Sequence, residues 1–136
     1  MKVPLAVLAD YVNITVDGKL NIMGIFDTIY VPAGFPTVHQ SMRLVARFQF
    51  APAERGSTKT IEIKLLDEDG GELLKLATSI PIPQDAPLNP EVPQIVELSG
   101  IPFAKAGAYA FSILVNGEEK ATVPFRVLPL PTPQGS

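Results

Sequence analysis

The 136-residue sequence contains no cysteine and no tryptophan, and His39 is its single histidine. Without cysteine the chain has no disulfides and no thiolate nucleophile, and a single imidazole excludes zinc sites built from several His or Cys ligands. A Ser-His-Asp arrangement would have to use His39, which we expect to be a solvated loop side chain. No Gly-x-Ser-x-Gly, Gly-x-Gly-x-x-Gly or Gly-x₄-Gly-Lys motif occurs either. We therefore expect no enzymatic activity and no cofactor.

Charge is also sparse. Charged residues make up 18% of the chain, against about 25% in typical globular proteins. The formal net charge is −3, and the 11 lysines and arginines are spread along the sequence. Nucleic-acid binding requires a basic patch, because phosphates are neutralised by clustered Lys and Arg, so we expect no nucleic-acid partner.

No apolar run approaches the roughly 18 to 20 residues of a membrane span, so we expect none. The first residues, MKVPLAVLADYV, begin like a signal peptide. The apolar run 3–9 is nevertheless short for such a peptide, and Asp10 follows it at once. We expect a first strand here, which slightly favours the cytoplasm.

Apolar residues recur with a period of two, which is typical of half-buried strands. In MRLVARFQF, residues 42–50, one face carries Met42, Leu44, Ala46, Phe48 and Phe50. TKTIEIKLL (58–66) and ELLKLATSI (72–80) repeat the alternation, and further strands are predicted at 5–12, 19–31, 92–98 and in both halves of 107–127. No helical period extends over more than two turns. The sequence thus predicts seven or eight strands.

The DEDGG segment between residues 66 and 72 predicts a turn. A four-residue loop with Gly70 in the left-handed region pairs Ile63 with Leu74, whereas a two-residue turn pairs Leu65 with Leu74. Both registers keep the apolar faces matched, so the periodicity does not choose between them.

The Asn-Gly pair within residues 107–127 predicts a hairpin whose register depends on the loop length. A two-residue turn at Asn116 and Gly117 sets Phe111 opposite Thr122, which places aromatic residues against a polar row. A three-residue loop, with Gly117 as a left-handed bulge residue, sets Phe111 opposite Ala121 and matches the apolar faces. We therefore expect the three-residue loop.

Fourteen prolines and ten glycines punctuate the strands. Five of the prolines lie in residues 81–93, which predicts a long crossover between two sheets. Gly24 is expected to provide the bend at which segment 19–31 changes its buried face. These features predict an all-β single domain over residues 1–128, an immunoglobulin-like antiparallel β-sandwich, followed by a Pro-rich disordered tail at 129–136. A jelly roll and a small barrel are the alternatives.

Three segments together resemble a family of uncharacterised short bacterial all-β proteins, a domain of unknown function. They are GKLNIMGIFDTI (18–29), IEIKLLDEDG (61–70) and GAYAFSILVNG (107–117). The resemblance covers nearly the whole chain and implies a β-sandwich and a bacterial source. It implies no catalytic or ligand-binding residue.

Candidate site residues are few. Asp67 and Asp69, with Glu68 between them, are candidate calcium ligands, which acids from other loops would have to complete: Asp10, Asp17, Asp27 and Asp85. Their spacing matches no EF-hand, and a polar turn accounts for them equally. Tyr11, Tyr30, Phe35 and Phe103 are candidates for stacking on a sugar or a partner, but we expect them to pack in or around the core.

These patterns favour a non-enzymatic interaction or structural module. We expect such a module to self-associate or to dock onto a larger assembly, because exposed strand edges can pair with another chain. A ligand-binding domain for a glycan or calcium, with its site in the loops at one end of the sandwich, is the alternative.

Overall fold

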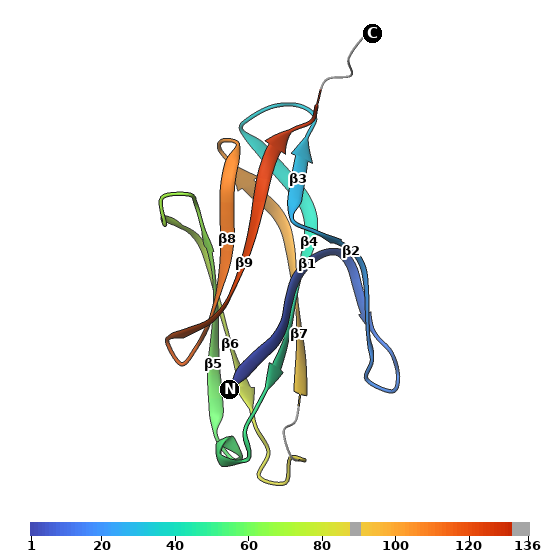
Figure 1. The fold of residues 1–136 in the computed structure, drawn as a ribbon, viewed down its shortest axis with the longest axis vertical. Coiled ribbons are helices and arrows are strands. Elements are labelled where there is room, and N and C mark those ends of the chain that lie inside the picture. Colours follow the sequence, from blue (N-terminus) through green and yellow to red (C-terminus); the bar gives the residue numbers. More distant parts are fainter. Residues whose placement is uncertain (88–90, 132–136) are drawn as a thin grey trace.

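The computed structural model describes residues 1–87 and 91–131, which form nine strands in two sheets and one short 3-10 helix (Figure 1). The 3-10 helix spans Pro52–Glu54, and the strands are β1 (Lys2–Ile14), β2 (Leu20–Phe26), β3 (Thr28–Val31), β4 (Thr37–Gln49), β5 (Thr58–Leu66), β6 (Glu72–Pro81), β7 (Glu91–Phe103), β8 (Gly107–Val115) and β9 (Glu118–Pro129). The sheet orders are β2-β1-β4-β7 and β3-β9-β8-β5-β6. One of the sheets curls like half of a barrel. Within the described residues no helix has the length and apolarity needed to cross a membrane.

The main core lies between the two sheets and follows the predicted alternation. The predicted apolar face of residues 42–50 is inside, with Met42, Leu44, Ala46 and Phe48 of β4 and the following Phe50 all buried. In the other sheet, β8 and β9 contribute a stack of rings, in which Phe125 lies 5.4 Å from Phe111 and 5.8 Å from Tyr109 between ring centroids. Such aromatic pairs add to the area that they bury and fix how the layers meet.

A second, smaller cluster, which the periodicity did not predict, lies outside the main core. Its buried members are Ala9, Val12 and Val45, and partly buried side chains pack against them: Val7, Leu20, Ile22 and Ile95. β1 contributes to both clusters, because Leu8 belongs to the main core while the adjacent Ala9 belongs to the second. The β1–β2 hairpin therefore packs against Val45 and Ile95, and Figure 1 shows it on the side of the molecule away from the β5–β6 turn.

The segment 19–31 forms two strands rather than one, and the chain passes from one sheet to the other at Asp27. β2 pairs with β1 in one sheet without any register shift at Gly24, and β3 pairs in parallel with β9 in the other sheet. Within β2 the buried face does change at Gly24, as predicted, because Leu20 and Ile22 pack on the second cluster whereas Phe26, of the same parity, packs against the main core. Gly24 does have a φ of +72°, and a Cβ there would lie 2.5 Å from Asp10 Oδ2, so the glycine permits a close approach of the two strands.

The β8–β9 hairpin corrects the three-residue loop predicted from the sequence. Asn116 and Gly117 form a two-residue turn, with φ of +49° and +83°, and Val115 pairs with Glu118. Positive φ at both central positions is the type I′ geometry that matches the strand twist.

The faces still match in this hairpin, because a register shift follows the turn. Leu114 pairs with Glu119 but Ile113 pairs with Ala121, so Lys120 is an extra residue in β9. Beyond this bulge Phe111 faces Val123. The apolar faces of the two strands do coincide, as expected. A bulge within β9 brings them into register, and a longer loop is not needed.

The β5–β6 turn resolves the alternative that the periodicity left open. Leu65 pairs with Leu74, the register predicted for the two-residue turn, but the turn itself is a three-residue loop, 68–70, closed by Asp67 and Gly71, in which Gly70 is left-handed at φ +81°. The backbone N–H of Gly70 donates to the Asp67 carbonyl at 3.0 Å, and the N–H of Asp67 donates to the Gly71 carbonyl at 2.9 Å. The register shifts between Leu65 and Leu66, because Leu73 is an additional residue opposite them.

The proline-rich segment does connect the two sheets, from β6 to β7, but the strands extend into it at both ends. Pro81 belongs to β6 and Pro93 to β7, while residues 88–90 of this segment are outside the described residues. The tail begins as ordered chain: β9 ends at Pro129, and the Leu130 N–H donates to the Val31 carbonyl at 2.9 Å. The remainder of the predicted tail, 132–136, also lies outside the described residues.

Candidate functional site

His39 lies on β4 and is half-buried, so the expectation of a solvated loop histidine is wrong. It pairs with Ile101 of β7, and its Nε2 atom is buried without a hydrogen-bond partner among the described residues. Burial lowers the pKa of His39, although the charge of Asp10 and a hydrogen bond with the Ser41 backbone act in the opposite direction. The imidazole is therefore neutral at neutral pH and packs as part of the strand.

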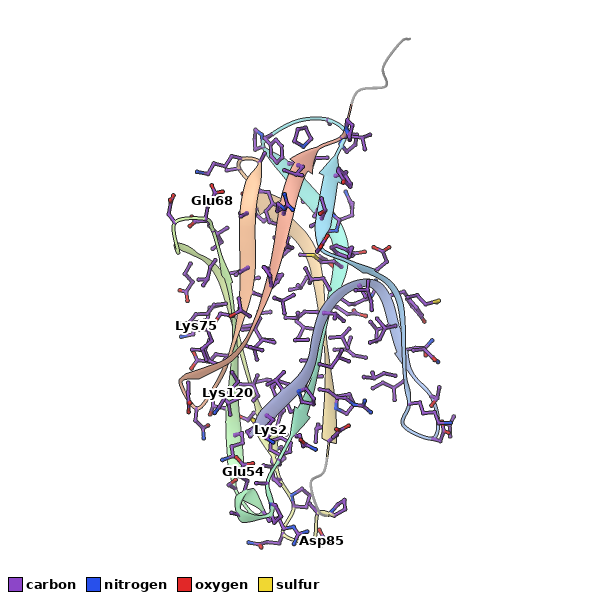
Figure 2. All side chains as sticks on the ribbon, in the orientation of Figure 1. Lys2, Glu54, Glu68, Lys75, Asp85 and Lys120 are labelled. Atoms are coloured by element: carbon purple, nitrogen blue, oxygen red, sulfur yellow. The ribbon has the colours of Figure 1, made fainter. Side chains whose placement is uncertain are left out.

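The acidic candidates mainly organise a turn. Asp67 Oδ1 accepts hydrogen bonds from the backbone N–H of Asp69 at 3.0 Å and of Gly71 at 2.7 Å. This is the capping role that Asp plays in tight turns. Glu68 and Asp85 lie at opposite ends of the molecule (Figure 2). Across residues 1–87 and 91–131, no group of three or more His, Cys, Asp or Glu side chains is arranged to hold a metal ion.

The four aromatic candidates do not gather into one platform. Phe103 is 1% exposed and packs edge-on against Tyr109, and Phe35 packs partly buried against the main core. Tyr11 is exposed on β1, where the Arg43 guanidinium lies 5.6 Å from its ring centroid. Tyr30 is exposed on β3, in the opposite sheet. Packing in or around the core accounts for Phe35 and Phe103 but not for the two exposed tyrosines.

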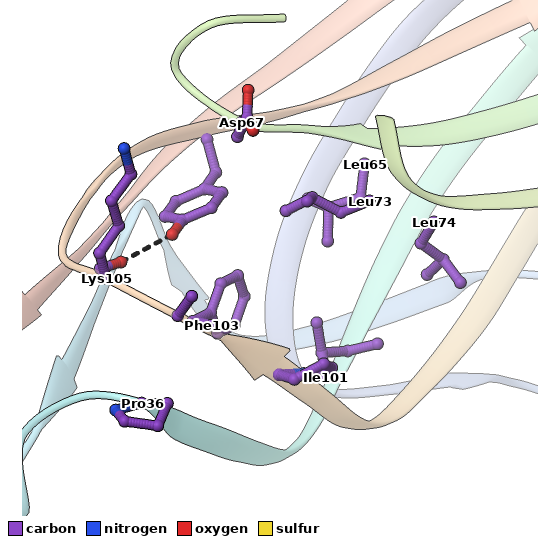
Figure 3. Close-up of a pocket in the computed structure, with 11 residues that line it drawn as sticks. Pro36, Leu65, Asp67, Leu73, Leu74, Ile101, Phe103 and Lys105 are labelled. Carbon is purple, nitrogen blue, oxygen red and sulfur yellow. Dashed lines mark hydrogen bonds between the residues drawn. The ribbon is translucent and has the colours of Figure 1, made fainter. Parts of the chain in front are cut away.

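An apolar cleft of about 380 Å³ opens between the two sheets, where β6 and β7 lie at the edges (Figure 3). Its walls are mostly hydrophobic and come from both layers: Leu65, Leu73, Leu74, Ile101, Phe103 and Tyr109. Tyr109 donates its hydroxyl proton to the Lys105 carbonyl at 2.6 Å, which ties the β7–β8 loop to the cleft wall. This volume is within the range of small-ligand and side-chain pockets, about 300 to 1,000 Å³.

A second hollow, of about 300 Å³, continues along the same open side of the sandwich. β6 contributes Leu76 and Thr78 to its lining, and β7 contributes Gln94 and Val96. Leu74, Leu76 and Val96 are only partly buried although they pack against the main core. The two hollows lie next to each other along β6, at Leu74 and Leu76, and we call them together the β6–β7 groove.

Three of the four sheet edges carry features that discourage pairing with another strand. β3 has only four residues, β2 is interrupted by left-handed Gly24, and β7 contains Pro93 and Pro102, which have no N–H to donate. β6 is a ten-residue strand without glycine, and its proline is the last residue, Pro81.

β6 has some protection of its own, but it is confined to one residue and one end. Leu73 forms a bulge at the start of the strand. Lys75, the kind of residue that often protects an edge, points away from the groove and pairs with Glu62 at 3.2 Å. Between residues 74 and 80 the edge of β6 is regular, and it borders the groove along this length.

The charges at the mouth of the cleft are unbalanced. The β5–β6 turn carries three consecutive acidic residues, Asp67, Glu68 and Asp69, and Lys105 is the cation that lines the cleft. None of the four takes part in an ion pair with the residues described in the structure. Three carboxylates and one ammonium leave a local charge of −2.

The structure brings two sequence candidates, Asp67 and Phe103, into this cleft, but the sequence reasoning missed Leu73 and Lys105. The adjacent leucines at 73 and 74 were the available signal, because two neighbouring apolar residues in an alternating strand indicate a bulge. The bulge lets both side chains line the same cleft, as Figure 3 shows. Nothing in the local sequence around Lys105 indicates that its loop lines the same cleft as the β5–β6 turn.

Residues 4–128 match the model of a family of unknown function, DUF6941. The chain belongs to this family. The match confirms the resemblance drawn from the three segments and covers β1 to β9 almost completely, including the β6–β7 groove. A comparison of this DUF6941 chain with curated proteins finds no match.

Proposed function

We propose that this domain is a non-enzymatic interaction module that binds an extended segment of another polypeptide along β6. The observation that carries the proposal is the position of the groove. The regular, unprotected stretch of β6 borders the apolar cleft of about 380 Å³, on the side where the sandwich is open. An exposed edge and an apolar pocket beside it are the two parts that strand addition requires.

Strand addition supplies two kinds of contact. Among residues 1–87 and 91–131 no strand pairs with the side of β6 that faces away from β5, so its backbone groups can bond an added strand, which gives affinity without sequence preference. Alternate side chains of that strand then point into the groove, against Leu74 and Leu76 of β6 and Val96 of β7. Each buried aliphatic side chain contributes about 1.5 to 3 kcal/mol of transfer free energy, which sets a preference for apolar residues at every second position.

The same proposal includes an immunoglobulin-like architecture. It is supported by the pairing of β4 with β7 in one sheet and the order β9-β8-β5 in the other, which correspond to the B–E and G-F-C pairings of that fold. Chain crossings from β4 to β5 and from β7 to β8 also run between the sheets, as Greek-key connections do. In this view β6 is the additional edge strand beyond the C position.

Selection from a library of random displayed peptides provides the test, followed by NMR chemical-shift mapping on the full chain. We expect binders whose apolar residues alternate and whose shifts concentrate on β6 and the groove. Thr78→Lys places a charge on the groove side of β6, whereas Ser79→Lys places the same charge on its opposite face. Both residues are exposed, so both variants should fold.

We expect Thr78→Lys to weaken binding at least tenfold and Ser79→Lys to weaken it little, because an inward charge is desolvated by an added strand. A second copy of the chain is another possible occupant, and light scattering at increasing protein concentration detects it. If the protein stays monomeric and no selected peptide perturbs β6, the proposal is wrong.

A further inference from the structure

We infer that the segment taken up by β6 carries a lysine or arginine at the end that lies beside the β5–β6 turn. This inference rests on the proposed function and adds the charge of the partner. It follows from how the charges are distributed around the β6–β7 groove.

Along β6 itself the charges are already balanced. Glu72 pairs with Lys64 at 3.8 Å, and Lys75 pairs with Glu62 at 3.2 Å. Both pairs join β6 to its neighbour β5, so a partner strand finds no net charge along the middle of the edge. The uncompensated charge lies at the start of β6, in the turn that precedes it.

One carboxylate of the turn lines the cleft, and the other two follow it within the same turn. Asp67 lines the cleft directly, and its Oδ1 atom is held by the N–H groups of Asp69 and Gly71. Glu68 reaches toward β8, where its Oε1 atom accepts from the Ala108 N–H at 3.5 Å. These carboxylates are held by neutral N–H donors, which leave their negative charge in place.

Lys105 offsets only one of the three negative charges. It lies on the β7–β8 loop, which the Tyr109 hydroxyl holds at the opposite side of the cleft (Figure 3). An apolar side chain that fills the cleft therefore brings its neighbouring residues beside a local charge of −2. A basic residue next to that apolar anchor is attracted, and an acidic one is repelled.

The effect is modest and depends on salt. An exposed ion pair changes an affinity by about fivefold at most, and the interaction is screened beyond a Debye length of about 10 Å at 0.1 M salt. The charge therefore selects among apolar segments and speeds their association, while strand pairing and the cleft supply most of the affinity.

The test uses the peptides selected on the full-length chain, with dissociation constants measured by fluorescence anisotropy at about 50 mM and about 500 mM salt. We expect Lys or Arg to be enriched at one end of the binders. Replacing that residue with Gln should weaken binding about three- to fivefold at low salt, and the loss should nearly disappear at high salt.

Two protein variants locate the charge. The double variant Glu68→Gln, Asp69→Asn removes two carboxylates while Asp67 continues to hold the turn, and it should abolish the preference for the basic peptide. Asp85→Asn is the matched control, because Asp85 lies at the far end of the molecule (Figure 2) and should change nothing.

The outcomes separate the two claims. Peptides that shift β6 resonances but show no basic preference, or that bind the double variant equally well, overturn this inference and leave strand addition intact. Enrichment of Asp or Glu overturns it as well. If no selected peptide perturbs β6, the proposed function and this inference both fail.

Discussion

Replacing Asn116 with alanine should destabilise the protein by about 2 kcal/mol, through two separate losses. The residue has a φ of +49°, a conformation that costs an alanine about 1 kcal/mol more than an asparagine. Its Oδ1 atom also accepts a hydrogen bond from the Thr60 N–H at 2.9 Å, which is worth about 1 kcal/mol. Asn116 thereby joins the β8–β9 turn to β5, since its own N–H donates to the Thr60 carbonyl at 2.8 Å.

Two further substitutions separate these contributions. Asn116→Gly removes the strain and keeps the loss of the hydrogen bond, so we expect about 1 kcal/mol. Asn116→Asp keeps an acceptor and tolerates the left-handed region, so it should stay within about 0.5 kcal/mol of the wild type.

Urea unfolding measures the series. With a slope of about 1.5 kcal/mol per molar urea, the midpoint of Asn116→Ala should fall by more than about 1 M. In a three-residue loop Asn116 would be right-handed and an alanine would fit without strain. An alanine variant within about 0.5 kcal/mol of the wild type would therefore refute the two-residue turn.

Two other perturbations test the core and the pH dependence. Phe111→Ala should lower the free energy of unfolding by about 3 to 5 kcal/mol, because the ring is fully buried and its centroid lies 5.4 Å from that of Phe125. Val38→Ala, at an exposed position, should lower it by less than about 0.5 kcal/mol. Similar losses for the two variants in urea unfolding would contradict the packing described. Burial raises the pKa of Glu54, but hydrogen bonds from the Ala51 N–H and the Met1 ammonium, together with Lys59, outweigh it and lower that pKa overall. A lowered pKa stabilises the fold above the unfolded value, about 4.3, and this stability is lost as pH falls through the folded value. Glu54→Gln should thus be less stable than the wild type at pH 7 and equally stable near pH 3, and a difference that persists in acid in urea titrations would refute this.

The fold was largely predictable where burial alone decides the structure. The alternation in residues 42–50 correctly predicts that Met42, Leu44, Ala46, Phe48 and Phe50 lie in the core, because successive side chains of a strand point to opposite faces and one face is apolar. Val45, on the opposite face, is also fully buried, since the β1–β2 hairpin packs over it. No local pattern indicates that covering, which depends on contacts between segments distant in sequence.

Bulges explain most of the errors in register. An extra residue at Lys120 restores the matched faces after a two-residue turn, and another at Leu73 does the same after the β5–β6 turn. Periodicity determines which residues share a face, but several combinations of loop length and bulge give the same face. The choice at Asn116 is decided by strand twist and by the bonds to Thr60, which a pattern of apolar residues does not contain.

The candidate site depends on the arrangement of the edges rather than on any motif. The sequence suggested strand edges that pair with another chain, but it did not indicate which of them is open. β6 and β7 are consecutive in the chain, yet they end up in different sheets with a groove between them. That separation follows from the crossover at residues 81–93, and it places Lys105 opposite an acidic turn almost 40 residues earlier in the chain.

Hydrogen–deuterium exchange of the β6 amides, with and without a saturating selected peptide, tests the central claim most directly. In the part of the chain that the structure describes, β6 is an edge strand, so its amides that point away from β5 should exchange rapidly in the free protein. The account predicts that alternate amides between residues 74 and 80 slow at least about tenfold when the peptide binds, while β2, β3 and β7 are unaffected. Protection at one of those edges instead, or at none, would contradict it.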